Sequence, residues 1–375
     1  MISKCIIAAE LSESSVLKAV IIAKTLLAIL GLVAVTVFLK TKGISWLGHP
    51  HTKCMFSIHV ASTYLSTVFY LICFVTDLWR FSFSHKDRCG YVLPFRFAFP
   101  VRLIAVIGTF GQLLSITAIA MERLYASIRP ASYERLNSPL IKGVSSVIVI
   151  GLSIGLNVGL CVPGVRWDEP ASSFTIRTPE NRERFQMLVN VEVAIELAAL
   201  LTFHFCLWLN FRKKISRTNY VAGRYQVSWN KRLIIQLLPV FWTHFFCIII
   251  TSFGLVMYPY VASNIFTKDT PTNHGIFLEF VAIAPLYAVI MPVLVAYRNP
   301  QSARFTATMG ENARLNGAPR GSRTPEDDKN DADEHFKALH ELFASPPTKR
   351  NSAVRAVVRE AEQGFGAMCC FSVEE

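Results

Sequence analysis

Apolar residues are concentrated in seven segments of 19–26 residues, each with few charged interruptions. A helix rises about 1.5 Å per residue, so about 20 such residues cross the roughly 30 Å hydrocarbon layer of a bilayer. Backbone amides in lipid must be paired within their own segment, and the alternating pattern of barrel strands is absent. The pattern predicts an all-α membrane protein, a GPCR-like bundle of seven transmembrane helices at residues 19–39, 55–75, 103–121, 143–163, 187–209, 233–258 and 276–297.

The composition agrees with this pattern. Of 375 residues, 52% are apolar and 17% are charged. A soluble, disordered or collagen-like chain does not have this balance. The run Cys5–Ala9 is the only apolar stretch before the first span, and it is too short for a secretory signal. We therefore expect an uncleaved N-terminal tail.

The distribution of basic residues predicts the orientation. With the N-terminus outside, the inner loops carry 14 Lys and Arg residues and the outer loops carry 10. Acidic residues sharpen the contrast to +12 inside against +3 outside. Anionic lipid at the inner leaflet accounts for this charge more simply than nucleic acid does. The expected parts are an extracellular tail (1–18), a seven-span domain (19–305) and a cytoplasmic, largely disordered tail (306–375), in which short amphipathic or only transient helices are both compatible with the spacing.

The third span ends in Glu122-Arg123. A guanidinium at the inner mouth of a central helix can be held by a carboxylate at rest and released when the bundle opens. The alternative is that Arg123 only marks a span end attracted to the inner leaflet.

Polar residues inside the spans are candidates for a binding cavity, because ionisable groups are costly in lipid. Glu192 and Glu196 are one helical turn apart on one face of the fifth span. His244 lies at a depth comparable to that of Glu196, and we expect Lys24 to extend its amine to the outer interface. The alternative role for the glutamates is structural hydrogen bonding between helices. The predicted ligand-binding set is Gln112, Glu192, Glu196, Trp242, His244 and Glu279.

Prolines in the last two spans predict hinges. Pro239 precedes Trp242 by three residues, and Pro285 and Pro292 flank the middle of the seventh span. A proline in a helix frees a carbonyl and bends the backbone. Ordinary kinked packing is the alternative.

Several short motifs resemble one family. They are Met121-Glu122-Arg123, Ala126, Tyr133-Glu134 ten residues after Arg123, and Arg224-Tyr225-Gln226 before the sixth span. With the seven-span layout, they resemble the nematode seven-transmembrane chemoreceptors, in the superfamily that holds the Sra, Srab, Srb and Sre classes. The resemblance covers roughly residues 19–305, and the length and motif spacing look most like the Sre class.

This resemblance implies a G-protein-coupled receptor for a small environmental molecule, in the plasma membrane of sensory cilia. It implies that Lys231-Arg232 stands where rhodopsin-like receptors often hold an acid, so a resting clamp on Arg123 must use another carboxylate, Glu122 or Glu134. The residues expected to face the G protein or to switch are Glu122, Arg123, Tyr133, Glu134, Arg224, Tyr225 and Gln226.

Cysteines supply two further expectations. Cys89 lies in the first outer loop, where receptors often tie the third span to the second outer loop. The second loop, 164–186, has no cysteine, so Cys161 is the nearby candidate for a bridge; an unbridged Cys89 stays open. Cys369 and Cys370 are a candidate palmitoylation pair or two plain reduced thiols.

The enzyme motif His-Glu-x-x-His and the phosphate-binding Gly-rich loop followed by Lys and Ser or Thr do not occur. We expect no cofactor and no metal, and we interpret His49 and His51 as loop residues. The rival functions are a secondary transporter or a ligand-gated channel using Glu192, Glu196 and Glu279, and a structural bundle without a ligand. Many secondary transporters contain an internal repeat, and we see none in this sequence.

Overall fold

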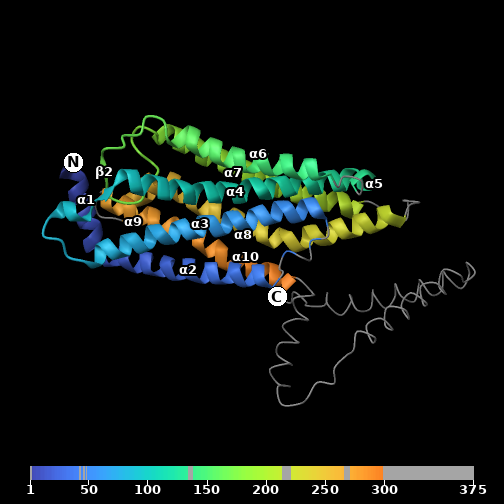
Figure 1. The fold of residues 1–375 in the computed structure, drawn as a ribbon, viewed down its shortest axis with the longest axis horizontal. Helices are drawn as coiled ribbons and strands as arrows, with labels where there is room; N and C mark the ends of the chain where they lie inside the picture. The colour runs from blue at the N-terminus through green and yellow to red at the C-terminus, as the bar shows by residue number, and fades with distance from the viewer. Residues whose placement is uncertain are drawn as a thin grey trace, which may run out of the picture. The chain divides into compact units, whose positions relative to one another are not determined.

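The computed structural model describes residues 2–41, 44, 47, 49–133, 138–212, 221–265 and 271–298. Within these residues the chain is almost entirely helical (Figure 1). The helices are α1 (Ile2–Glu13), α2 (Ser15–Lys40), α3 (Pro50–Ser82), α4 (Phe95–Ile128), α5 (Pro130–Tyr133), α6 (Pro139–Cys161), α7 (Arg182–Arg212), α8 (Val221–Ile265), α9 (Pro271–Val281) and α10 (Ala284–Arg298), with a 3-10 turn η1 (Arg88–Tyr91).

Seven membrane-length helical segments confirm the predicted fold class. They lie in α2, α3, α4, α6, α7 and α8, and in the pair α9–α10, which together form the seventh segment. Local sequence explains several boundaries. The Ser14 hydroxyl accepts a hydrogen bond from the amide of Leu17 and starts α2. Pro50 and Pro139 stand at the first positions of α3 and α6, where a missing amide hydrogen costs nothing.

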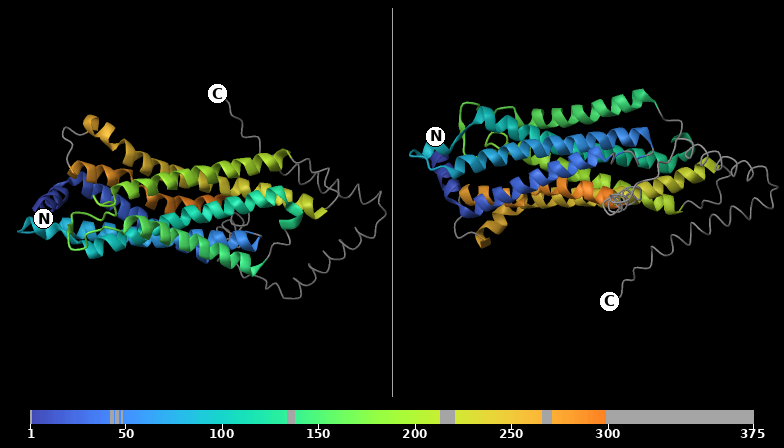
Figure 2. Two further views of the ribbon diagram at one scale, coloured as in Figure 1. Left: turned by 90° about the horizontal axis from the view of Figure 1, so that it is seen from above. Right: turned by 60° about the horizontal axis from the view of Figure 1, so that its bottom comes forward.

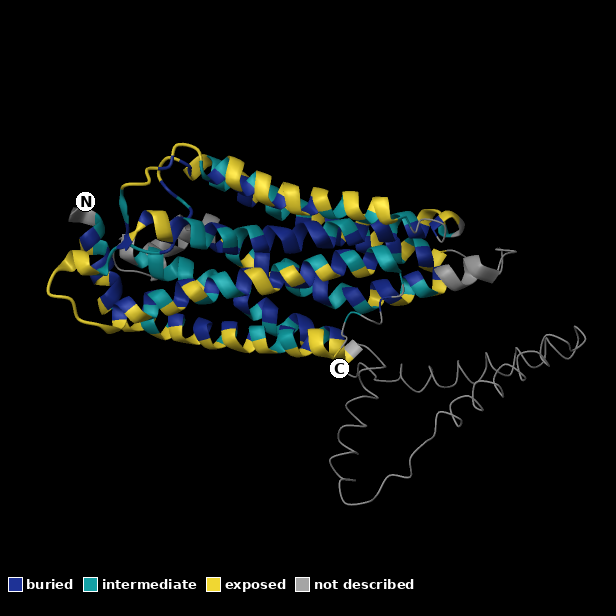
Figure 3. Cartoon of the chain, viewed as in Figure 1, coloured by how far each residue is buried: buried dark blue, intermediate teal, exposed yellow. Residues whose placement is uncertain are grey.

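α4 is the central helix of the bundle. In its most apolar window 72% of residues are buried, against 22% in α6, whose outer face is exposed along its length (Figure 3). α3 approaches α4 closely at Gly108, where an added Cβ would lie 2.8 Å from the Cβ of Ser66. The centre of the bundle is therefore organised around the α3–α4 pair.

The predicted hinge prolines take different places. Pro239 and Pro292 lie inside α8 and α10, whereas Pro285 lies in the first turn of α10, directly after the break between α9 and α10. Both views of Figure 2 show the outer end of α8 diverging from the bundle before α9 returns to it. Whether these prolines act as hinges stays a prediction.

The outer loops form a small layer at one end of the bundle. Strands β1 (Leu93–Pro94) and β2 (Pro170–Ala171) pair antiparallel, with Leu93 opposite Ala171. This pairing holds the second outer loop against the start of α4. Across this end lies α1, within the segment expected to be an N-terminal tail (Figure 1).

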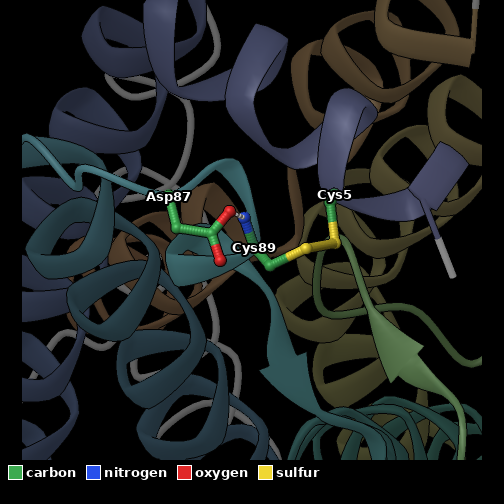
Figure 4. The surroundings of a disulfide bond; sticks show 3 residues. All are labelled: Cys5, Asp87 and Cys89. Atoms are coloured by element: carbon green, nitrogen blue, oxygen red, sulfur yellow. Dashed lines mark hydrogen bonds between the residues drawn. A yellow bond between two sulfur atoms is a disulfide. The ribbon is translucent and has the colours of Figure 1, made fainter.

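The predicted Cys89–Cys161 bridge is wrong. Cys89, in η1, is bonded to Cys5 of α1, and Cys161 is a buried free thiol (Figure 4). Residues 1–18 were expected to be an extracellular tail, and the helix α1 brings Cys5 of this segment beside Cys89. The candidate pair Cys369–Cys370 lies outside the described residues.

Candidate functional site: an outer cavity and an inner polar network

A cavity of about 200 Å³ lies between the outer parts of the helices. Its walls come from α1, α2, α3, α4, α7, α8, α9 and α10 and from residues 173–177 of the second outer loop. Most of the lining is apolar, as in sites for small molecules. Four of the residues predicted to bind ligand line it, namely Gln112, Glu192, His244 and Glu279.

Buried charges gather on one side of this cavity. The Lys24 amine lies 2.7 Å from Glu279 Oε2, and the guanidinium of Arg102 lies 3.9 Å from Glu279 Oε1. Asp77 and Arg80 form a separate pair at 2.8 Å. The expectation that Lys24 reaches the interface is wrong, because Glu279 offers its amine a partner inside the bundle.

A histidine and a glutamate form a second cluster deeper in the bundle. His244 Nδ1 lies 2.9 Å from Glu196 Oε1, and both side chains are 2% exposed. Glu196 therefore stands behind His244 and is not among the described residues that line the cavity. His244 Nε2 and Glu196 Oε2 are buried without a hydrogen-bond partner among the described residues. Beside His244, the Tyr287 hydroxyl lies 2.6 Å from His59 Nε2.

Trp242 does not reach the cavity. Its ring packs 5.3 Å from that of Phe246 and 5.6 Å from that of His204, centroid to centroid. Two residues on a helix are about 200° apart in direction, so His244 and Trp242 point to opposite sides of α8. Placing both at one site was wrong for this geometric reason.

The outer end of the cavity is covered by α1. Leu11 of α1 contributes to the lining. The helix is held in place by the Cys5–Cys89 bond and by Lys4, whose amine lies 2.5 Å from Glu169 of the second outer loop. Arg80 of α3 donates a hydrogen bond to the carbonyl of Ser172 at 2.7 Å and thereby holds the second outer loop against the bundle. Sequence patterns gave no signal of this cover, apart from the apolar run Cys5–Ala9.

The inner end of the bundle contains a polar network around Arg123. This side chain is fully buried. Its guanidinium lies 2.9 Å from Glu122 Oε1 and donates to Thr52 Oγ1 at 2.7 Å and to Asn230 Oδ1 at 3.0 Å. It also donates to the hydroxyl of Tyr133, which in turn donates to Glu122 at 2.5 Å. Predicted partners Glu122 and Tyr133 therefore meet Arg123 directly.

Tyr133 lies beyond the inner end of α4, in α5. Burial raises the pKa of its phenol, and the adjacent Glu122 carboxylate raises it further against the opposing effect of Arg123. The phenol therefore keeps its proton and stays a donor to Glu122 at neutral pH.

Two histidines complete the surroundings of Glu122. His49 Nδ1 lies 2.9 Å from Glu122 Oε1, and His51 Nδ1 lies 3.4 Å from Oε2. Interpreting these histidines as plain loop residues was wrong, since the start of α3 brings them beside the end of α4. The 73 residues between His49 and Glu122 conceal this contact in the sequence.

Asn230 of α8 links the network to two further helices. Its amide donates to Ser127 Oγ at 2.8 Å, and Asn210 of α7 donates to the same oxygen at 2.7 Å. The inner end of the sixth span has Lys231-Arg232 where rhodopsin-like receptors often hold an acid, and the neutral Asn230 before Lys231 provides the link instead. Glu134 lies outside the described residues, and the side chains of Arg224, Tyr225 and Gln226 are not described either.

Metal binding finds no support in this part of the chain: among the described residues, His, Cys, Asp and Glu form no group suited to an ion. The arrangement is instead a cavity at one end of α4 and a closed polar network at the other. An arrangement of this kind can bind a molecule at one end and change its packing at the other.

Comparisons with known proteins agree with this arrangement. A family model described as serpentine type 7TM GPCR receptor class ab chemoreceptor matches residues 2–314. The protein named serpentine receptor class alpha-6, of Caenorhabditis elegans, is 22% identical over 301 residues, which cover 78% of this chain and 83% of that relative. The matched class is ab, and the Sre class that length and spacing favoured is not shown. Short motifs shared across a superfamily do not separate its classes.

Proposed function

The chain belongs to the class ab serpentine 7TM chemoreceptors, and from this premise we propose that it converts binding of a small molecule in the outer cavity into activation of a heterotrimeric G protein at the inner end. The family consists of multi-pass membrane chemoreceptors, not enzymes. The observation that carries the proposal is the burial of Arg123 in a network joining α3, α4, α5 and α8.

A single helix connects the two ends. α8 contributes His244 to the cavity and Asn230 to the inner network. These residues are about 21 Å apart along the helix axis at 1.5 Å per residue, and Pro239 lies between them. A ligand that packs better when α8 is displaced would favour the state in which Asn230 leaves Arg123. Only such a difference in affinity lets binding shift the equilibrium.

The orientation has physical support. The Cys5–Cys89 bond joins α1 to the first loop at the cavity end, and disulfides persist in oxidising compartments. We propose that this end faces outward in the plasma membrane of a sensory cilium. Epitope tags at the two termini test the orientation: accessibility of both from the same side of an intact cell would contradict it.

The direct test of coupling uses Arg123. Cells expressing the chain with a calcium reporter are screened with volatile and water-soluble compounds. For any activating compound, we expect Arg123→Ala to reach the cell surface and to lose the response. When Asn230 moves away from position 123, this variant has no guanidinium to offer to the G protein. Arg129→Ala, an exposed arginine six residues further on, is the matched control and should respond normally. A normal response of Arg123→Ala would reject the proposal.

The transporter alternative receives less support. A proton relay would need Glu192, Glu196 and Glu279 to communicate, yet Glu196 is paired with His244 and Glu279 with Lys24. Substrate uptake by vesicles that contain the chain and no G protein would favour a transporter. Ligand-evoked current in the same membranes would favour a channel.

A further inference from the structure

Arg102 is a charged group beside the cavity that has no carboxylate within hydrogen-bond distance among the described residues. Its side chain is 14% exposed and lines the cavity wall. Among the described residues, Glu279 has the one carboxylate within ion-pair distance of Arg102. Its Oε1 lies 3.9 Å from the guanidinium, and this distance is too long for a hydrogen bond. On its other side the guanidinium lies 4.7 Å from the centre of the Tyr70 ring. Within the part of the chain that the structure describes, the five donors of this guanidinium have no acceptor oxygen at hydrogen-bond distance, and the Cys73 sulfur is the acceptor beside them.

The charges around Arg102 do not balance. Lys24 already holds Glu279 at 2.7 Å, so two cations share one carboxylate. Asp77 does not make up the difference, because it is bonded to Arg80 at 2.8 Å. Arg177, from the second outer loop, adds another guanidinium to the lining. Since an arginine side chain stays charged in proteins, this side of the cavity retains a positive charge without an anion.

The remaining walls are suited to an apolar body. Leu11, Leu17, Ile21, Val106 and Phe110 are among the residues that face the cavity. The volume of about 200 Å³ limits the occupant to a small molecule.

We propose that the cavity selects small apolar molecules that carry one carboxylate, and that Arg102 binds this carboxylate. This assignment rests on the proposed receptor function and names its ligand class. Arginine and carboxylate form parallel charge-assisted hydrogen bonds, which the 3.9 Å separation from Glu279 leaves available.

Glu192 also lines the cavity, and its carboxylate could bind a ligand that carries an amine instead of a carboxylate. A buried carboxyl can become neutral by taking up a proton, whereas the guanidinium cannot become neutral by losing one. The unmet charge that persists without a ligand is therefore that of Arg102.

The test measures thermal unfolding of the purified full chain in lipid nanodiscs, where a ligand of the native state raises the midpoint. The probes are hexanoic acid, hexanol and hexylamine at neutral pH, matched in chain length. We expect hexanoic acid to raise the midpoint in a saturable manner, and hexanol and hexylamine to need at least roughly tenfold higher concentrations for an equal rise.

Two substitutions should shift this affinity in opposite directions. Arg102→Gln should weaken the effect of hexanoic acid by roughly tenfold or more and leave that of hexanol unchanged. Glu279→Gln should strengthen the effect of hexanoic acid, since it frees Arg102 and Lys24 from their shared carboxylate. The control Arg96→Gln removes an exposed arginine paired with Asp168 and should change neither.

If Arg102→Gln does not fold, Lys24→Gln preserves the test. It leaves Glu279 to Arg102 alone and should weaken hexanoic acid binding. A residue with only a structural role would not give opposite changes in Glu279→Gln and Lys24→Gln.

Equal stabilisation by hexanol and hexanoic acid, no stabilisation by hexanoic acid, or weaker hexanoic acid binding in Glu279→Gln would overturn the assignment. Stabilisation by hexylamine that depends on Glu192 would overturn it in favour of an amine. These unfolding measurements contain no G protein, so they test the ligand class and not the receptor function. The receptor function is tested by the cell response and its loss in Arg123→Ala, and it can hold even if the carboxylate preference fails.

Discussion

Arg102 and Arg123 are two arginines of the same helix, α4, 21 residues and about 32 Å apart along its axis. Arg123 has an acidic partner at 2.9 Å and two neutral acceptors at 2.7 and 3.0 Å, from Thr52 and Asn230. Arg102 has one shared carboxylate at 3.9 Å and a cavity beside it. At the inner end of α4, Arg123 therefore has several close acceptors, although its Nε has no hydrogen-bond partner among the described residues. At the outer end, Arg102 has no carboxylate within hydrogen-bond distance.

This difference separates two uses of buried charge. A network with many close pairs favours one arrangement, because losing a member leaves another buried group without its partner. An unsaturated site keeps binding free energy available for a molecule that enters later. The inner network is therefore suited to hold the resting packing of the helices, and the outer site is suited to recognition.

The largest predicted effect contrasts two glutamates under the same chemical change. Glu122→Gln should lower the free energy of unfolding by about 3 kcal/mol or more, because it leaves Arg123 buried without its acidic partner. Glu192→Gln should change it by less than about 1 kcal/mol or raise it, since the partly buried Glu192 carboxyl has no ion pair to lose among the described residues. Denaturant unfolding of both variants in the same lipid measures the contrast. Equal destabilisation by the two would remove the distinction between the ends.

Loss of the disulfide should have the next largest effect, on the outer end alone. Cys5→Ser opens a covalent loop of 84 residues and should destabilise the cover formed by α1 by about 2–4 kcal/mol. Proteolysis of residues 2–13 reports this opening directly. The buried inner network should be unaffected, so protection of α4 near Arg123 in hydrogen exchange serves as the internal reference.

Cys54→Ser is the control for the disulfide variant. It alters a free cysteine of α3 whose sulfur lies 3.4 Å from Ser146 Oγ, and it should leave proteolysis of α1 unchanged. Addition of a reductant to the wild-type chain should reproduce the effect of Cys5→Ser. Slow proteolysis of α1 in both cases would contradict the role given to the bond.

The sequence predicts the spans well because lipid imposes a length and a composition that can be counted. The predicted first span, 19–39, lies within α2, Ser15–Lys40, and the predicted fourth, 143–163, overlaps α6, Pro139–Cys161. The same criterion of apolar composition excludes charged residues from the spans, so it does not predict the charged side of the cavity. Asp77, Arg80 and Arg102 end an apolar window, so they were assigned to an outer loop, 76–102. In the structure α3 and α4 continue through them: Asp77 and Arg80 pair with each other, and Arg102 lines the cavity.

Site residues could be predicted where one helix carries the signal. Glu122 and Arg123 are adjacent in the sequence and adjacent in the network. Partners on other helices could not be predicted, because nothing local marks them: Asn230 is 107 residues from Arg123, and Cys5 is 84 residues from Cys89. Such contacts depend on which helices pack side by side, and local sequence patterns do not show which helices are neighbours.

The smallest predicted effect compares an exposed lysine pair with a buried one. Hydrogen bonds from Lys4 and Arg166 lower the pKa of the exposed Glu169 carboxyl. A lowered carboxyl pKa stabilises the fold above the ordinary pKa of the group, and this contribution disappears as the pH falls through the lowered value. Lys4→Gln should therefore slightly reduce stability at neutral pH and not in acid, and salt should screen the difference. Lys24→Gln, at the buried pair with Glu279, should cost clearly more and be insensitive to salt. Unfolding midpoints at low and high salt measure both variants. The Lys4 side chain is 37% exposed, so salt should screen its pair with Glu169. A loss of stability in Lys4→Gln that does not depend on salt would contradict this surface role.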